Sequence, residues 1–393
     1  MKKAPFVIHK YHICFKRLEM RSIYLLVLAI FLLSASCKHE TDTEAKAVNK
    51  FSDSTICKIH DLKDRRNTNE LVSFLTNADN KYRNEAALAL ASVGDTAALS
   101  ALIKAFNIAG SEKDNPEFQL NIALTILQSC PKMSYSMFEN LYETSTNNNV
   151  KQVVLWAMGR CQVPQKDSFK SIAQEILIGT SSELKLGLIK GYYEYALTGV
   201  WNIGMIETAL EFAKTKNDDE LRIYAANYLT RLTRIGAIEI ESAFTQDPHN
   251  FQIQLIELIK HENEPLAKLH LVRALQIFNS QQKVAIINEE LDKENDYRVK
   301  LELINAVDDR IYFDFNNRLA ELIGIDNEHI ETAAATFFAK NGSLKDSILY
   351  RTLYKKAKFW QAKNQLILAR LDHRLLSDTN YTFLFNAVEN APN

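Results

Sequence analysis

Apolar and polar positions recur in one pattern along most of the chain. A polar turn rich in Asn, Asp and Ser is followed by an apolar residue, often a basic one, and then apolar positions at helical spacing. The apolar residues that open these segments, here called openers, lie roughly 31 to 45 residues apart. They are Tyr82, Phe118, Val150, Leu184, Leu221, Leu266, Tyr297 and Ile330. The pattern predicts a helix at each opener.

Between successive openers there is room for one more amphipathic helix. Segments such as "SIAQEILIG" (171–179) and "VAIINEELDK" (284–293) supply it. Two amphipathic helices cannot cover their apolar stripes within one hairpin, so neighbouring hairpins must stack. The chain has only 11 Gly and 7 Pro, too few for the turns of a many-stranded β protein. We therefore predict an all-α fold, with residues 58–393 forming one stacked array.

The first unit, "NKYRNEAALALASVGD" (80–95), has the clearest boundaries. Asn80 or Lys81 is expected to begin the helix. Gly94 is placed to be its left-handed C-cap, and Asp95 to accept hydrogen bonds from amides of the next turn. The alanines between them allow a close approach to neighbouring helices.

The segment "YRNEAALALASVGDTAALSALIKAF" (82–106) resembles a HEAT repeat, with its Arg, paired Ala and Gly-Asp in the expected order. Later units resemble it only loosely. The resemblance implies a right-handed α-solenoid of about nine HEAT-like hairpins. It also implies a scaffold that binds a protein or peptide.

Basic residues recur just after several openers and should line up along the array. Two interpretations are open: a solvated basic edge, or a ladder of contacts to neighbouring acidic or carbonyl groups. The residues are Arg83, Lys151, Lys185, Arg222 and Arg298.

The segment "MRSIYLLVLAIFLLSASC" (20–37) has the layout of a secretory signal: a basic start, an apolar run and small residues before a cysteine. As a helix its apolar run, residues 23–33, rises about 16 Å, roughly half of a bilayer's hydrocarbon core. The small residues before Cys37 resemble the lipobox of bacterial lipoproteins, although Ser34 stands where that family prefers Leu. The resemblance implies that Cys37 is lipidated and becomes the mature N-terminus. A cleaved signal without lipid and an uncleaved anchor are the alternatives.

We accordingly expect residues 1–36 to be a signal peptide, with Met1 or Met20 as the natural start. Residues 37–57 are polar and are expected to form a tether, because they bury too little apolar surface to fold. Their acidic beginning, "CKHETDTE", resembles export signals of surface lipoproteins, or is simply a solvated linker. The expected location is the cell envelope, with the chain anchored by lipid to the outer membrane on its periplasmic or surface face.

Charge and cysteine content exclude several classes of function. Without residues 1–36 the net charge is about −6, which argues against nucleic-acid binding. Cys57, Cys130 and Cys161 remain after the leader and the lipid site. They are odd in number, widely spaced and free of any CxxC pair, so we expect buried, inert thiols instead of a disulfide framework.

No motif of catalysis, metal binding or cofactor binding occurs in the sequence. HExxH, GxGxxG and GxxxxGK[ST] are absent, and His261-Glu262 is the one His-Glu pair within the predicted array. We therefore expect no catalytic residue, no metal and no cofactor in this chain.

The segment "GLIKGYYEYALTGVWNIG" (187–204) concentrates aromatic residues among four glycines. Tyr and Trp are favoured at recognition hot spots, so a protein-binding patch is one interpretation. Packing at an irregular junction between repeats is the other. The candidate residues are Tyr192, Tyr193, Tyr195 and Trp201.

The segment "LLSDTNYTFLFNAVENAPN" (375–393) is predicted to be the first helix of a further hairpin, whose exposed apolar residues need a cover. Together, the lipobox, tether and residues 62–98 resemble the N-terminal region of Bacteroidetes lipoproteins in which HEAT-like repeats precede a cyclophilin-type peptidylprolyl isomerase. No cyclophilin-like segment is present. The alternative function is therefore the scaffold half of such an isomerase, with the catalytic domain beyond Asn393. The oligomeric state is left open.

Overall fold

The computed structural model describes residues 52–77, 79–111, 116–130, 134–164, 167–234, 250–278, 280–307, 312–341 and 347–372. Contacts divide the chain into two units, Met1–Cys57 and Lys58–Asn393. All regular structure in the described residues is helical, and no strand occurs among them. The all-α prediction is confirmed. The predicted signal segment, Cys37 and the C-terminal segment 375–393 lie outside the described residues.

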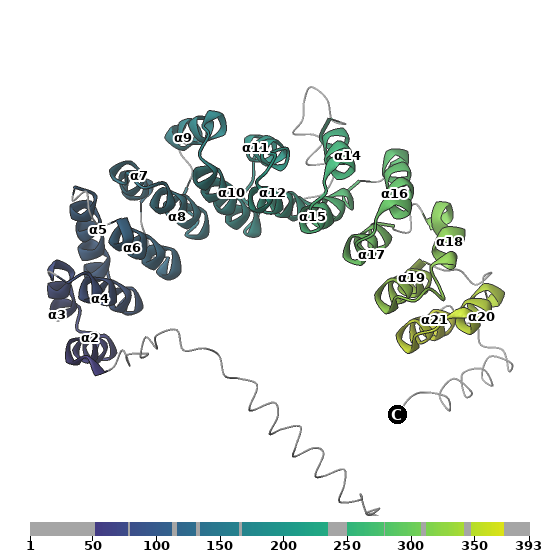
Figure 1. Cartoon of the computed structure of the whole chain (residues 1–393), viewed down its shortest axis with the longest axis horizontal. Coiled ribbons are helices and arrows are strands. Elements are labelled where there is room, and N and C mark those ends of the chain that lie inside the picture. The colour runs from purple at the N-terminus through teal and green to yellow at the C-terminus, as the bar shows by residue number, and fades with distance from the viewer. Residues whose placement is uncertain are drawn as a thin grey trace, which may run out of the picture. The chain divides into compact units, whose positions relative to one another are not determined.

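In the second unit, the eight helices that contain the openers, together with the last helix described, form a first row. Each of them packs against the next helix of the row, as Figure 1 shows. The row consists of α4 (Asn80–Val93), α6 (Pro116–Ser129), α8 (Asn148–Arg160), α10 (Ser182–Leu197), α12 (Asp219–Arg231), α15 (Pro265–Leu275), α17 (Tyr297–Asn305), α19 (Glu328–Asn341) and α21 (Trp360–Asp372).

The helices between the openers form a second row. Each packs against the first-row helix that follows it in the chain. They are α3 (Thr68–Ser73), α5 (Thr96–Ser111), α7 (Tyr135–Thr144), α9 (Asp167–Ile178), α11 (Ile203–Ala213), α14 (Asn250–His261), α16 (Gln281–Lys293), α18 (Tyr312–Glu321) and α20 (Ser347–Lys356). The helix α2 (Ser54–Asp64) precedes them, and the short helices η2 (Phe74–Thr76) and η3 (Leu232–Arg234) follow α3 and α12.

In each first-row helix from α4 to α19, the third residue of the helix is directed toward the core. Buried or half-buried openers occupy this position in α4, α6, α8, α10, α12 and α19. Helices form at Leu266 and Tyr297 as predicted, but these two openers are 39% and 42% exposed. In α15 and α17 the third residues are Ala267 and Val299, and both are fully buried. The cap decides this register, because it fixes the residue at which the helix begins.

The boundaries of α4 agree closely with the sequence. Gly94 adopts φ 66° as a left-handed C-cap, which confirms the prediction. Asp95 accepts a hydrogen bond from the Ala98 amide at 2.6 Å and another from the Thr68 hydroxyl. These bonds hold the pKa of Asp95 below its ordinary value, and the bond from Thr68 contributes most. The N-cap is Asp79, one residue before Asn80, with its carboxylate bonded to the Lys81 amide at 2.8 Å.

Candidate functional site

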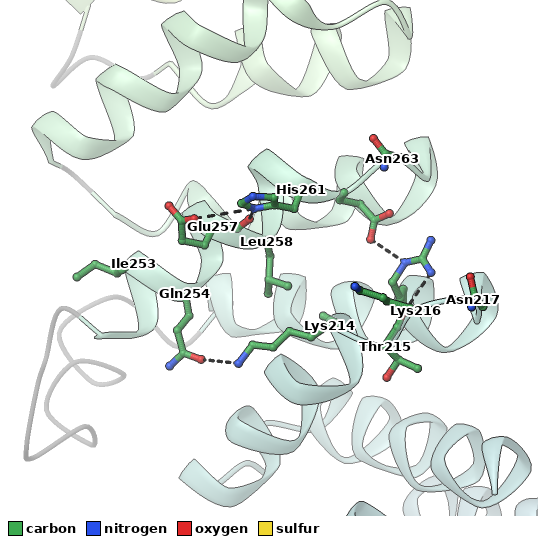
Figure 2. Close-up of a pocket in the computed structure, with 13 residues that line it drawn as sticks. Lys214, Thr215, Lys216, Asn217, Ile253, Gln254, Glu257, Leu258, His261 and Asn263 are labelled. Atoms are coloured by element: carbon green, nitrogen blue, oxygen red, sulfur yellow. Dashed lines mark hydrogen bonds and ion pairs between the residues drawn. The ribbon is translucent and has the colours of Figure 1, made fainter. Parts of the chain in front are cut away.

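A large groove lies between α11, the turn that leads into α12, and α14. Its volume is about 750 Å³. Figure 2 shows its lining side chains, which come from the end of α11, from residues 214–217, and from one face of α14 with the residues after it. The groove therefore lies where two successive helical pairs meet.

Lys214 forms hydrogen bonds to two helices that border the groove. Its ammonium group donates to the side-chain oxygen of Gln254 on α14 at 3.2 Å (Figure 2). It also donates to the carboxylate of Glu211 on α11 at 2.5 Å. A single side chain thus links α11 with α14 across the groove. Because Lys214 already has these two partners, it adds little unbalanced charge to the groove.

At the other end of the groove, Arg222 on α12 forms a network with Glu262. The Arg222 Nε lies 2.9 Å from the Glu262 carboxylate, and Nη2 lies 2.7 Å from that of Asp219. Burial opposes the charge on Arg222, but the bonds to Glu262 and Asp219 hold its pKa above the ordinary value. The other oxygen of Glu262 accepts the Glu264 amide at 2.8 Å. This buried pair closes the groove and holds the start of α15.

Apolar and amide groups form the rest of the surface. Ala213 and Leu258 are buried beneath it, and Ile253 is 46% exposed. Asn217 and Asn263 carry side-chain amides at the same end as Arg222 (Figure 2). Asn217 adopts φ 63°, a left-handed conformation that Asn tolerates better than most residues. The groove thus combines an apolar floor with groups that both donate and accept hydrogen bonds.

His261 lies at the rim of the groove, with its side chain exposed. Its Nδ1 donates to the carbonyl oxygen of Glu257 at 2.8 Å and lies 3.9 Å from that residue's carboxylate. Although Glu262 is the next residue, its carboxylate bonds Arg222 instead of lying beside the imidazole. Among the described residues, no group of three or more His, Cys, Asp or Glu is arranged to hold a metal ion.

Two smaller grooves adjoin the large groove along α14. A groove of about 240 Å³ between α14 and α16 shares Ile253 and Glu257 with it. Another of about 260 Å³ shares Glu262 and Asn263. We call the three together the α14 track. The three grooves share lining residues on α14 and just after it, which favours an elongated ligand over a compact one.

The structure places the predicted aromatic residues in two environments. Tyr192 and Tyr195 are only 4% and 3% exposed. The Tyr195 hydroxyl donates to the Val163 carbonyl oxygen at 2.5 Å, and burial raises the pKa of both phenols. Their rings belong to the core, so packing at a junction between repeats describes these two residues.

Tyr193 and Trp201 are only half-buried. The Tyr193 hydroxyl accepts a hydrogen bond from Arg231, whose guanidinium lies 4.8 Å from the Tyr193 ring centre. Trp201 packs against the core with one side. A role of these two residues in binding a protein stays a prediction. The structure does not bring the four aromatic residues together as one exposed patch.

The recurring basic residues follow neither interpretation uniformly. Arg222 bonds Glu262 of the next unit, as a ladder would require. Arg298 instead bonds Asp296, the N-cap of its own helix. Three others lie over aromatic rings of neighbouring helices, at distances from cation to ring centre of 5.3 Å (Arg83 over Phe118), 4.7 Å (Lys151 over Tyr142) and 6.0 Å (Lys185 over Phe212). A cation–π contact with an aromatic ring was in neither of the two interpretations drawn from the sequence.

Sequence reasoning also missed the α14 track. One signal pointed to it: the longest separation between openers, about 45 residues, runs from Leu221 to Leu266 and contains α14. No protein-family model matches the chain, and no curated protein is significantly similar to it. Among the described residues, no helix combines the length and apolar character that crossing a bilayer requires.

Proposed function

We propose that the chain is a lipid-anchored scaffold of the cell envelope that binds an extended peptide segment of a partner protein along the α14 track. In this proposal residues 58–393 form a right-handed α-solenoid of HEAT-like hairpins. Nine successive helical pairs among the described residues, α3/α4 to α20/α21, support the solenoid, as does the packing of each first-row helix on the next. Cys37 carries the lipid.

The observation that carries the binding proposal is the composition of the track. An extended peptide presents an N–H and a C=O group at almost every residue, and each needs a partner when water is excluded. The amides of Gln254, Asn217 and Asn263 both donate and accept hydrogen bonds. Ile253 offers an apolar contact for a side chain of the ligand.

The charges of the track point to a ligand segment without strong net charge. Lys214 bonds Glu211, and Arg222 bonds Asp219 and Glu262, so most formal charges in the groove are balanced within the protein. Binding should consequently depend on shape, hydrogen bonding and apolar contact, and only weakly on ionic strength.

A selection with short random peptides displayed on phage tests the proposal. The purified chain is the bait, and a selected peptide is then measured by fluorescence anisotropy against variants. We expect Ile253→Asp and Gln254→Ala to weaken binding about 10-fold or more, because each removes a contact from the centre of the track. Ile348→Asp, at an exposed isoleucine of α20, is the matched control and should bind as the unmodified chain does.

The proposal is wrong if selected peptides bind Ile253→Asp as tightly as the unmodified chain. It is also wrong if a photoreactive residue at position 253 gives no adduct with a peptide that binds, while one at position 348 does. Circular dichroism of each variant excludes unfolding as the cause of weaker binding.

A further inference from the structure

Cys130 and Cys161 occupy equivalent positions in consecutive first-row helices. Cys130 directly follows α6, and Cys161 directly follows α8. These two helices pack against each other. The sequence separates the cysteines by about thirty residues, but the repeat brings the two helix ends side by side.

One backbone carbonyl connects the two residues. The amide of Cys130 donates to the carbonyl oxygen of Ile126 at 2.9 Å, and the Cys161 thiol donates to the same oxygen at 3.9 Å. The Cys161 sulfur therefore lies within about 7 Å of the Cys130 backbone nitrogen. The Cys130 sulfur is 3.5 Å from the Leu127 carbonyl oxygen, and the nearby Cys130 thiol contributes to raising the pKa of Cys161. A disulfide requires this kind of proximity.

The two thiols form no disulfide, and both residues are partly buried. The expectation that they are buried holds only in part. Neither residue is fully enclosed by the core. Cys57, the third cysteine among the described residues, lies on α2, and the contacts that connect Cys130 with Cys161 do not include it.

We propose that Cys130 and Cys161 form a reversible disulfide that links the ends of α6 and α8. The reaction is exchange with a disulfide oxidant, either a small molecule or a protein. The thiolate of one cysteine attacks the oxidant disulfide, forms a mixed disulfide and releases one oxidant thiolate. The second cysteine, as thiolate, then attacks the protein sulfur of the mixed disulfide and releases the other oxidant thiolate.

The step is balanced in atoms and electrons. One S–S bond forms in the protein, and one breaks in the oxidant. Two electrons pass from the cysteine pair to the oxidant, and the two protons lost by the cysteines end on the two oxidant thiols. The new bond closes a loop between residues 130 and 161, which restrains the unfolded chain and joins two adjacent hairpins. The inference does not rest on the proposed peptide binding.

The experiment is a disulfide map of the full chain. The reduced protein is incubated with oxidised glutathione, its remaining thiols are blocked with iodoacetamide, and it is digested with trypsin. We expect one linked product that joins the peptide 114–132 to the peptide 161–166, and its loss on treatment with dithiothreitol. Oxidation should raise the Tm by about 5 °C.

Three variants are the controls. Cys57→Ser should keep the linked product, whereas Cys161→Ser should lose it. Cys130→Gly should also lose it and should still fold, because Cys130 adopts φ 42°, a left-handed conformation that suits glycine. Neither Cys130→Gly nor Cys161→Ser should show the rise in Tm.

Three results would overturn the proposal. In the first, both cysteines stay fully alkylatable after oxidation while circular dichroism shows a folded helical protein. In the second, each cysteine stops at a separate mixed disulfide with glutathione. In the third, the linked product comes only from dimers that separate from the monomer on a non-reducing gel.

Discussion

Gly159 on α8 lies directly against Gly191 on α10. A Cβ atom built on Gly159 would lie 2.1 Å from the Gly191 carbonyl oxygen, and one built on Gly191 would lie 2.7 Å from the Leu155 carbonyl oxygen. Gly187 faces the backbone of Gln152 in the same way, with its Cβ position 2.6 Å from that carbonyl oxygen. The two helices therefore meet backbone to backbone, and the obstacles are atoms that cannot rotate away.

Replacing Gly159 by Ala should destabilise the protein by about 2 to 4 kcal/mol, because α8 and α10 must separate to admit the methyl group. Thermal unfolding followed by circular dichroism measures the effect. Gly204→Ala is the matched control: its Cβ would meet only the Asn202 side chain, at 3.3 Å, so little loss is expected. Equal Tm values for both variants would contradict the backbone contact.

Glu331 should be a critical residue of the last helical pairs. It is fully buried on α19 and accepts three backbone amides: Gly324 at 2.6 Å, Lys358 at 2.9 Å and Phe359 at 2.8 Å. Glu331→Ala should cost about 3 to 5 kcal/mol, because it leaves three donors without their acceptor. Glu331→Gln should cost less, since one oxygen remains.

Hydrogen exchange locates the effect of Glu331→Ala. The amides of Gly324, Lys358 and Phe359 should exchange faster, while those of α4 should be unchanged. Unaltered exchange at the three amides would refute the role given to the carboxylate.

Glu294 should contribute to stability in a pH-dependent way. Burial opposes its ionisation, but the Asp296 amide and the Lys268 ammonium bond the carboxylate and hold its pKa below the ordinary 4.5. A carboxyl with a lowered pKa in the folded state stabilises the protein above its unfolded pKa, and that contribution is lost as pH falls. Glu294→Gln should thus lower the Tm at pH 7, with a difference that shrinks below about pH 4.5.

The control for this pH dependence is Glu207→Gln. Glu207 is exposed, and no ion pair or hydrogen bond of its side chain is described. The Tm of the Glu207→Gln variant should equal that of the unmodified chain at every pH. A Glu294→Gln difference that stays constant from pH 7 to pH 3 would contradict the assignment.

Formation of the Cys130–Cys161 disulfide should accelerate as pH rises. Burial raises the pKa of the Cys161 thiol, with a further contribution from the Cys130 thiol. Glu194 acts in the same direction, Arg160 acts against it, and Tyr195 also faces Cys161. Because the thiolate is the reactive form, quenched-flow alkylation should show a rate about 10-fold higher at pH 9 than at pH 8 while thiolates are scarce. A flat profile would show that the thiolate of Cys161 does not limit the reaction.

If Cys37 carries the lipid, as proposed, replacing it should release the protein from the membrane. Each buried methylene of an acyl chain adds about 0.8 kcal/mol to membrane binding, so several chains would hold the protein almost irreversibly. Cys37→Ser should move from the membrane fraction to the soluble fraction after centrifugation. Cys57→Ser, a substitution at another cysteine, should stay with the membranes. If Cys37→Ser sediments as before, the lipid assignment is wrong.

The amino-acid sequence by itself determined where helices begin and end. Caps and periodicity are local properties, so Gly94 and the turn at Asp95 were predicted correctly. Leu266 is an exposed opener because Pro265 begins α15 after the N-cap Glu264, which places Ala267 at the core-facing third position. Proline at the first helical position is itself a local signal, and it was available in the sequence.

Only the tertiary structure decided which residues of successive hairpins meet. The Gly159–Gly191 contact, the three amides on Glu331, the Cys130–Cys161 pair and the α14 track each join residues of different helices or of the turns that follow them. Their proximity depends on the distance and rotation between packed helices. The packing of many side chains together determines both quantities. Helical periodicity identifies the buried face of a helix, whereas the packing of whole helices selects the partner of each residue on that face.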